Sequence, residues 1–251
     1  MTDKPTIILG KGPSARFLKP SDKYNIATIN NALWMCDSPT WAFITDLVIF
    51  EIMDDDDFKK VKTMVVPSFL QSWGEPSILT PGTAISRKGS RLTAVHFQKL
   101  YEFFPDRFNH IEFKVWCLYE GQNEKPEELG RNVPPAPQVP EYPQSTTVTA
   151  IWWLSSVEKV KDFILMGNDP SGGYHPYFTK ESPKFHGKST PAPDGSKAVG
   201  QAYYQATWNQ SLAIAKKYNV RLRHINDIDE DELNSLGILK NKETMLHENR
   251  K

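Results

Sequence analysis

Four polar segments of this sequence each follow a short apolar run that is typical of a buried β-strand. They are Gly10-Lys11-Gly12-Pro13-Ser14, Asn30-Asn31, Thr45-Asp46 and Gly167-Asn168-Asp169. The carboxyl ends of parallel strands form the ligand-binding edge of an open α/β sheet, so these segments are expected to meet there. Glycines let a backbone approach an anion closely, and N–H groups at the start of a helix favour negative charge. The pattern therefore predicts a phosphate or nucleotide site, with a plain strand-to-helix turn as the alternative for the first segment.

A second set of chemically useful side chains lies in the long segment from Asp169 to Gly200, which is rich in Gly, Pro and Ser. A loop of this length in a compact domain predicts a lid or binding loop. Histidine titrates near neutral pH and suits general-base catalysis, while tyrosine hydroxyls suit stabilisation of a departing phosphate. We favour His186 as the base, with His175 as its rival, and the full candidate set is Tyr174, His175, Tyr177 and His186.

The acidic run Asp54-Asp55-Asp56-Asp57 offers carboxylates of the kind that bind Mg²⁺ or Mn²⁺. It comes after an apolar stretch and directly before Phe58-Lys59-Lys60. This position favours a solvated helix boundary over a metal site. We therefore predict neither a metal nor a cofactor.

The elements that must position these side chains are visible as apolar runs. Seven runs predict strands: Thr6–Leu9, Asn25–Ile29, Thr40–Ile44, Lys62–Val66, Phe113–Leu118, Asp162–Met166 and Val220–Ile225. Several are almost continuously apolar, as expected for strands covered on both faces. Apolar residues at helical spacing predict helices over Leu92–Phe104, Thr147–Val160 and Ala198–Tyr218. This alternation predicts an α/β fold with a doubly wound, mainly parallel, Rossmann-like sheet and a long lid after Gly167-Asn168-Asp169.

Length and composition limit the class of protein. The 251 residues fit one Rossmann-like domain over 1–226, including the lid over 169–200, and a charged tail over 227–251. Thirty basic and thirty acidic residues cancel, which argues against a general attraction to nucleic acid or anionic membrane. The two cysteines lack metal-type spacing and are expected to be buried free thiols. With no apolar run near the length of a membrane span and no signal-peptide core, we expect a cytoplasmic protein.

The order of these motifs resembles that of bacterial CMP-sialic-acid-dependent sialyltransferases that modify lipooligosaccharide. The similar features are the Gly-x-Gly-Pro-Ser bend, Asn30-Asn31, Phe43-Ile44-Thr45-Asp46, and Ser145-Thr146-Thr147 opening an apolar helix before Gly167-Asn168-Asp169. Tyr177 and His186-Gly187-Lys188 follow at similar places. The resemblance covers roughly residues 5–50 and 144–225. It implies a Rossmann-like glycosyltransferase that needs no metal for its chemistry.

The resemblance also implies roles for single residues. Gly10, Gly12 and Ser14 would lie at the nucleotide, and Asn30 near the phosphate or sugar. Thr147 would stand near the donor carboxylate and Asp169 at the cytidine. Tyr177 would hydrogen-bond the leaving phosphate, and His186 would be the base. The binding set that we predict for the nucleotide or substrate is Gly10, Lys11, Gly12, Ser14, Asn30, Asn31, Thr146, Thr147, Asn168, Asp169 and Tyr174.

Three positions depart from the family pattern. Lys11 replaces a small or polar residue, Gln144 stands at the place of an arginine, and Ser171 at the place of the first of two phosphate-binding tyrosines. The absence of that arginine argues against sialic acid itself as the sugar. We expect a nucleotide-sugar donor, a glycan or other hydroxyl-bearing acceptor, and a homo-oligomer as a possibility. The alternatives are an ATP-binding pyrophosphokinase of the hydroxymethylpterin type and a non-catalytic nucleotide-binding module.

Overall fold

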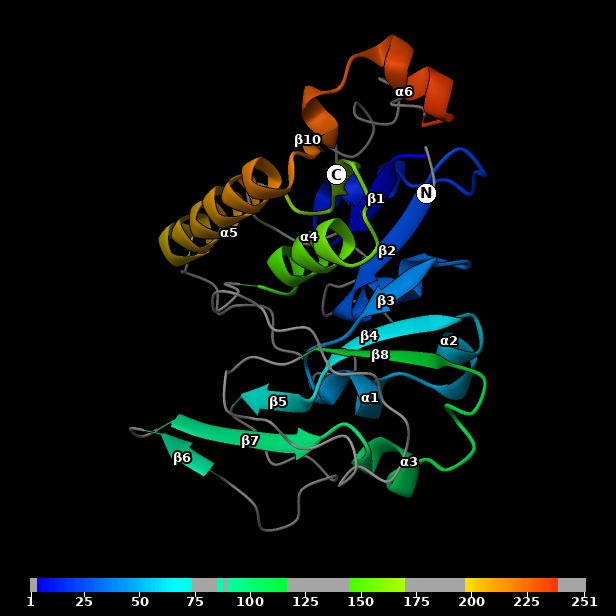
Figure 1. The fold of residues 1–251 in the computed structure, drawn as a ribbon, viewed down its shortest axis with the longest axis vertical. Helices are drawn as coiled ribbons and strands as arrows, with labels where there is room; N and C mark the ends of the chain where they lie inside the picture. Colours follow the sequence, from blue (N-terminus) through cyan, green and yellow to red (C-terminus); the bar gives the residue numbers. More distant parts are fainter. Residues whose placement is uncertain (1–3, 74–84, 88–89, 117–144, 170–196, 239–251) are drawn as a thin grey trace, which may run out of the picture.

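A seven-stranded, all-parallel sheet forms the centre of the molecule (Figure 1). The computed structural model describes residues 4–73, 85–87, 90–116, 145–169 and 197–238. The strand order is β10-β9-β1-β2-β3-β4-β8. The strands are β1 (Thr6–Leu9), β2 (Asn25–Ile29), β3 (Trp41–Phe43), β4 (Thr63–Pro67), β8 (Glu112–Trp116), β9 (Asp162–Met166) and β10 (Arg221–His224). Each overlaps one of the seven runs predicted from the sequence, so the predicted α/β fold is confirmed.

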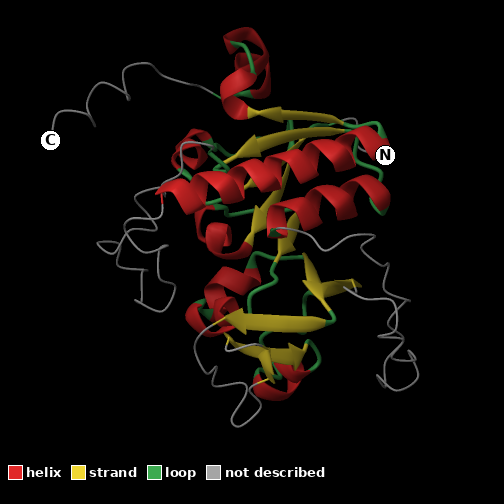
Figure 2. Cartoon of the chain, turned by 90° about the vertical axis from the view of Figure 1, so that its left-hand side faces the viewer, coloured by secondary structure: helices red, strands yellow, loops and turns green. Residues whose placement is uncertain are grey.

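Helices cover both faces of this sheet, which explains why its strands are almost continuously apolar. Ile8 packs toward α4 (Thr146–Ser156), while Ile7 and Leu9 pack into a second buried cluster on the opposite face. Figure 2 shows α4 side by side with α5 (Lys197–Tyr218) across one face. The remaining helices are η1 (Pro13–Phe17), η2 (Asn30–Met35), α1 (Val48–Ile52), α2 (Asp55–Lys59), α3 (Lys99–Phe103), η5 (Ile225–Asp227) and α6 (Glu230–Leu236), where η denotes a 3-10 helix.

A second, three-stranded antiparallel sheet lies between β4 and β8 in the chain and corrects one prediction. Its order is β5-β7-β6, with β5 at Phe69–Trp73, β6 at Ile85–Arg87 and β7 at Ser90–His96. The helix predicted over 92–104 was therefore wrong in its first half, and only α3 is helical there. Residues 92–96 pair with β5 in register, Leu92 opposite Trp73 and His96 opposite Phe69. This pairing with a distant strand outweighs the helical spacing of the apolar residues.

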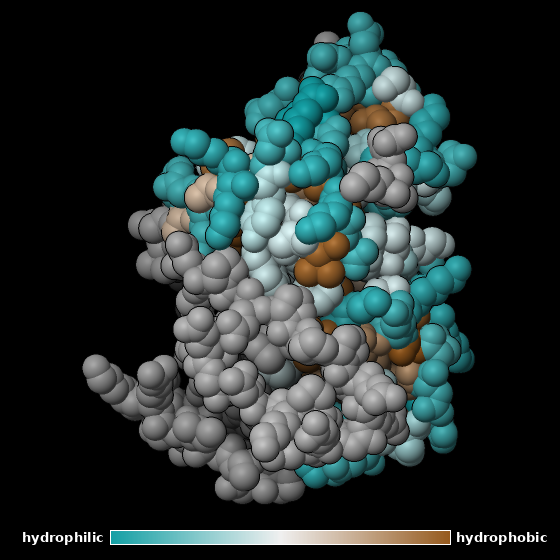
Figure 3. Space-filling model, in the orientation of Figure 1, coloured by the Kyte–Doolittle hydropathy of each residue, from teal (hydrophilic) through white to brown (hydrophobic). Residues whose placement is uncertain are grey.

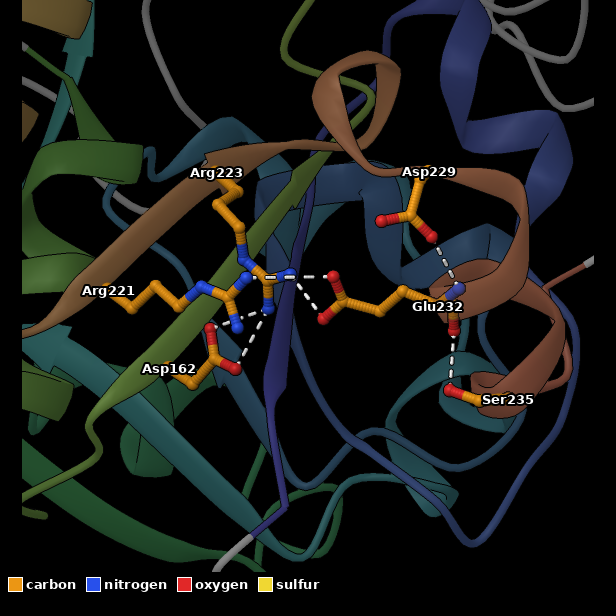
Figure 4. Close-up of polar contacts among 6 residues, drawn as sticks. All are labelled: Asp162, Arg221, Arg223, Asp229, Glu232 and Ser235. Atoms are coloured by element: carbon orange, nitrogen blue, oxygen red, sulfur yellow. Dashed lines mark hydrogen bonds and ion pairs between the residues drawn. The ribbon is translucent and has the colours of Figure 1, made fainter.

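The described part of the predicted charged tail packs on the domain. Ile228, Leu233 and Ile238 are buried in the same cluster as β1 and β9. Ion pairs of Arg223 on β10 also connect α6 to the sheet. Its guanidinium donates to both carboxylate oxygens of Asp162 at 2.8 Å and pairs with Glu232 of α6 (Figure 4). Burial by itself lowers the pKa of Arg223, but its bonds to Glu232 and Asp162 leave that pKa raised overall. The segment over 228–238 is therefore part of the folded domain.

One of the two cysteines that were expected to be buried free thiols is described, while Cys117 lies outside the described residues. Cys36 is buried and carries a free thiol, whose pKa burial raises to about 11. Hydrophilic side chains dominate the face around α6 in Figure 3. Among the described helices, none combines the length and apolar character needed to cross a membrane.

Candidate functional site

The chain reverses its direction across the sheet between β1 and β9. After β1 the chain moves to β2 on one side, whereas after β9 it moves to β10 on the other side. Such a switch point leaves a crevice at the carboxyl ends of the two strands, where ligands bind in open α/β folds. The loops Gly10–Ser14 and Gly167–Asp169 both begin at this point. The structure therefore brings together the two motifs that the sequence placed at strand ends.

The glycines of these two loops allow their backbones to touch. The N–H of Gly10 donates to the carbonyl oxygen of Met166, and the N–H of Gly12 donates to that of Gly167, both at 2.7 Å. A methyl group on Gly10 would lie 2.3 Å from the carbonyl oxygen of Gly167, and one on Gly12 would lie 2.3 Å from Oδ2 of Asp169. Gly167 has a φ of +72°, a conformation that favours glycine. Both glycine N–H groups therefore donate within the protein, and the expectation that Gly10 and Gly12 lie at the nucleotide stays a prediction.

Asp169 connects three strand ends. Its Oδ2 accepts a hydrogen bond from the N–H of Ser14 at 2.9 Å, and its Oδ1 lies 3.6 Å from Nε2 of His224. Ser14 completes the link by accepting from the N–H of Gly167 at 2.7 Å through Oγ. Nδ1 of His224 accepts from the N–H of Asn226 at 3.2 Å, which places the ring proton of a neutral His224 on Nε2, facing Asp169. Asp169 therefore holds the site together from a buried position.

The N-terminus of α4 contributes hydroxyls on both sides of the switch point. Ser145 caps the helix by accepting from the N–H of Val148. The hydroxyl of Thr147 donates to Oδ1 of Asn168 at 2.8 Å, and Nδ2 of Asn168 donates to the carbonyl oxygens of Ile8 and Met166. The side chain of Asn168 is thus fixed by β1 and β9, and it orients Thr147 in turn.

A small polar cluster lies at the carboxyl ends of β2 and β3. Oγ1 of Thr146 is 2.6 Å from Oγ1 of Thr45 and accepts from Nδ2 of Asn30 at 3.4 Å. Oδ1 of Asn30 accepts from the N–H of Thr45 at 3.1 Å, and Asn30 itself has a φ of +49°. The structure therefore joins Asn30 and Thr146, both in the predicted binding set, with Thr45, which was expected at the end of its strand. Asn31, also predicted, is buried.

Lys11 is the cationic residue among the predicted binding residues, and it is partly buried after β1. Burial lowers its pKa from the ordinary value of 10.5, and the charge of Asp46, after β3, partly opposes that shift. A partly buried lysine therefore lies at the carboxyl edge, on the side of the switch point where β1, β2 and β3 end.

A pocket of about 440 Å³ opens on the other side, between α4 and α5 and over the ends of β9 and β10. Its size lies in the range of small-molecule sites. The described residues that line it are Thr147, Leu165, Asn168, Tyr204, Gln205, Thr207, Trp208, Ser211, His224, Asn226 and Asp227. Thr147 and Asn168 were predicted from the sequence, and the α5 and η5 residues were missed. Tyr204, Trp208 and Ser211 share one face of α5. Aromatic rings and hydroxyls at this helical spacing were the sequence signal that could have indicated a ligand-binding face.

Several predicted residues lie outside the described part of the chain. Tyr174, His175, Tyr177 and His186 all fall within 170–196, so their roles stay predictions. The acidic run is described, and it opens α2: Asp54 caps the helix, and Asp57 completes a capping box and accepts from Nε1 of Trp34 at 2.8 Å. In the described residues, no group of three or more His, Cys, Asp or Glu side chains is arranged to hold a metal ion.

Comparisons with known proteins identify no family for this chain. No family model matches the chain, and no curated protein or solved structure matches it either. The fold and the geometry of the carboxyl edge are therefore the basis for assigning a function.

Proposed function

We propose that this protein is a glycosyltransferase that moves a sugar from a nucleotide-sugar donor, of CMP type, to a hydroxyl acceptor. The observation that carries the proposal is the pocket between α4 and α5, which opens beside the switch point of a parallel sheet. Thr147 and Asn168 line it, and both belong to motifs that resemble the bacterial sialyltransferases. The order of these motifs along the chain, which resembles that of the CMP-sialic-acid-dependent enzymes, supports a donor of CMP type.

The two sides of the carboxyl edge suit different parts of such a donor. The pocket offers hydroxyls, an aromatic wall and a carboxylate, which suit a neutral group with hydrogen-bond donors. Lys11 and the cluster of Asn30, Thr45 and Thr146 lie at the ends of β1, β2 and β3 and suit the negative phosphate. The donor would thus lie across the switch point.

Transfer by this enzyme needs one proton acceptor and one stabilised leaving group. The base takes the proton of the acceptor hydroxyl, the oxygen bonds to the sugar carbon, and the bond from that carbon to the phosphate oxygen breaks. His186, with His175 as its rival, is proposed as the base, and Tyr177 as a donor to the leaving phosphate. His224 is unsuited to this role because Nδ1 already accepts from Asn226 and Nε2 faces Asp169.

Binding measurements test the proposal. The wild-type protein is titrated calorimetrically with CMP, and separately with ATP and Mg²⁺, and its thermal unfolding is followed in parallel. We expect CMP to bind and to raise the unfolding temperature, since a ligand that binds only the folded state stabilises it. Stabilisation by ATP with none by any cytidine nucleotide would refute the donor assignment and favour the pyrophosphokinase alternative.

A further inference from the structure

The pocket between α4 and α5 has an unusual charge for a nucleotide site. Among the described residues that line it, Asp227 is the one acidic residue, and none is lysine or arginine. A phosphate placed there would meet a carboxylate without a compensating cation. The pocket therefore suits an uncharged part of a ligand that carries hydrogen-bond donors.

The walls of the pocket suit a flat ring. Leu165 at the end of β9 is buried, and Trp208 on α5 is partly buried and packs against the same apolar cluster. Any nucleobase can stack on such an indole through its π-face, whichever of the bases it is. These apolar surfaces hold a base but do not distinguish one pyrimidine from another.

The rim of the pocket supplies a carboxylate on a turn whose backbone is anchored. Asn226 and Asp227 are exposed, but they lie between Ile225 and Ile228, which are both buried. The N–H of Asn226 donates to Nδ1 of His224 at 3.2 Å, and His224 caps the η5 turn that carries both rim residues. The backbone of Asp227 is thus held in place before any ligand binds, which lowers the entropy cost of recognition.

We infer that this pocket holds the base of the donor and that Asp227 selects cytosine over uracil. Cytosine carries an exocyclic amine that donates a hydrogen bond, and a carboxylate accepts from it. Uracil carries a carbonyl oxygen at that position, which a carboxylate repels. The inference rests on the proposed function and assigns to Asp227 the contact with cytidine that the family resemblance gave to Asp169.

Calorimetric titration of the full chain with CMP, UMP and cytidine tests this. Asp227→Asn is compared with Asp231→Asn, which changes an exposed carboxylate in the first turn of α6 outside the pocket. We expect Asp227→Asn to weaken CMP binding about 10- to 100-fold, the range for losing a hydrogen bond to a charged acceptor. UMP binding should stay unchanged or become tighter, because an amide can donate to its carbonyl. Cytidine should respond like CMP, and Asp231→Asn should bind all three like wild type.

The outcomes separate the inference from the function on which it depends. If wild type binds CMP but Asp227→Asn leaves the ratio of CMP to UMP affinity unchanged, the inference is wrong and the proposed donor stands. Equal weakening of CMP and UMP also overturns it, because that pattern reports damage to the fold of the pocket. If wild type binds no cytidine compound, the proposed function fails, and the inference fails with it.

Discussion

The N–H of Ser14 donates to Oδ2 of Asp169 at 2.9 Å, although the two residues are 155 positions apart. This bond connects the loop after β1 to the loop after β9 at the point where the chain reverses across the sheet. Asp169→Ala removes the acceptor and leaves a buried N–H without a partner. We expect a loss of about 1–3 kcal/mol in the free energy of unfolding, measured by urea denaturation. Asp231→Ala, an exposed control, should stay within about 0.5 kcal/mol of wild type; equal stability of both variants would show that the bond is unimportant.

Close contact between the two loops makes Gly10 intolerant of any side chain. The Cβ of Gly10→Ala would lie 2.3 Å from the carbonyl oxygen of Gly167, a backbone atom that cannot rotate away. We expect the free energy of unfolding to fall by about 1–3 kcal/mol or more, as for overpacked cores, and urea denaturation measures this change. Gly237→Ala is the comparison, since its φ of +78° brings strain but its nearest neighbour, Oγ of Ser21, is 3.8 Å away. If Gly10→Ala is as stable as wild type, the loops are not packed as described.

The strands of the seven-stranded sheet could be predicted from the sequence, whereas the side-chain contacts around the sheet could not. Runs such as Asp162–Met166 are apolar throughout because both faces are covered, and that signal is local. The strand β7 was missed because its identity depends on pairing with β5, which no local pattern encodes.

The contacts within the candidate site could not be predicted from the sequence. Gly10, Gly12 and Asp169 were correctly expected at strand ends. The sequence does not reveal that the two glycine N–H groups donate to Met166 and Gly167, or that Asp169 accepts from the N–H of Ser14. Asp227 was missed because an acid in a turn has an ordinary structural explanation. Its place on the rim depends on how η5 meets α5.

Thr147 is expected to act on ligand binding more than on stability. Its hydroxyl donates to Asn168 at 2.8 Å and lines the pocket, so Thr147→Val removes a polar group from the wall. We expect CMP affinity to fall about 5- to 10-fold by calorimetry, the equivalent of one neutral hydrogen bond. Thr149→Val is the matched control, because Thr149 is also buried on α4 and bonds to the carbonyl oxygen of Ser145. Equal effects of the two variants would contradict a role for Thr147 in the pocket.

The lowered pKa of Lys11 predicts a pH dependence of stability with a definite sign. Between its pKa in the folded state and the ordinary 10.5, the unfolded chain binds more protons at this residue than the folded chain does. The contribution of Lys11 to stability therefore increases with pH across that window. Wild type should gain stability relative to Lys11→Met when urea denaturation is repeated from neutral pH up to 10.5. A constant difference between the two proteins over that range would show that burial does not shift this pKa.

The release of nucleotide from a panel of donors shows whether this protein is a CMP-sugar-dependent glycosyltransferase. The protein is incubated with CMP-, UDP- and GDP-sugars and with ATP, each with and without excess EDTA, and the released nucleotide is quantified. We expect turnover of a CMP-sugar that persists in EDTA and falls in Asp227→Asn, while Asp231→Asn retains it. Turnover of ATP alone, lost in EDTA and restored by Mg²⁺, would refute the assignment as a CMP-sugar-dependent glycosyltransferase.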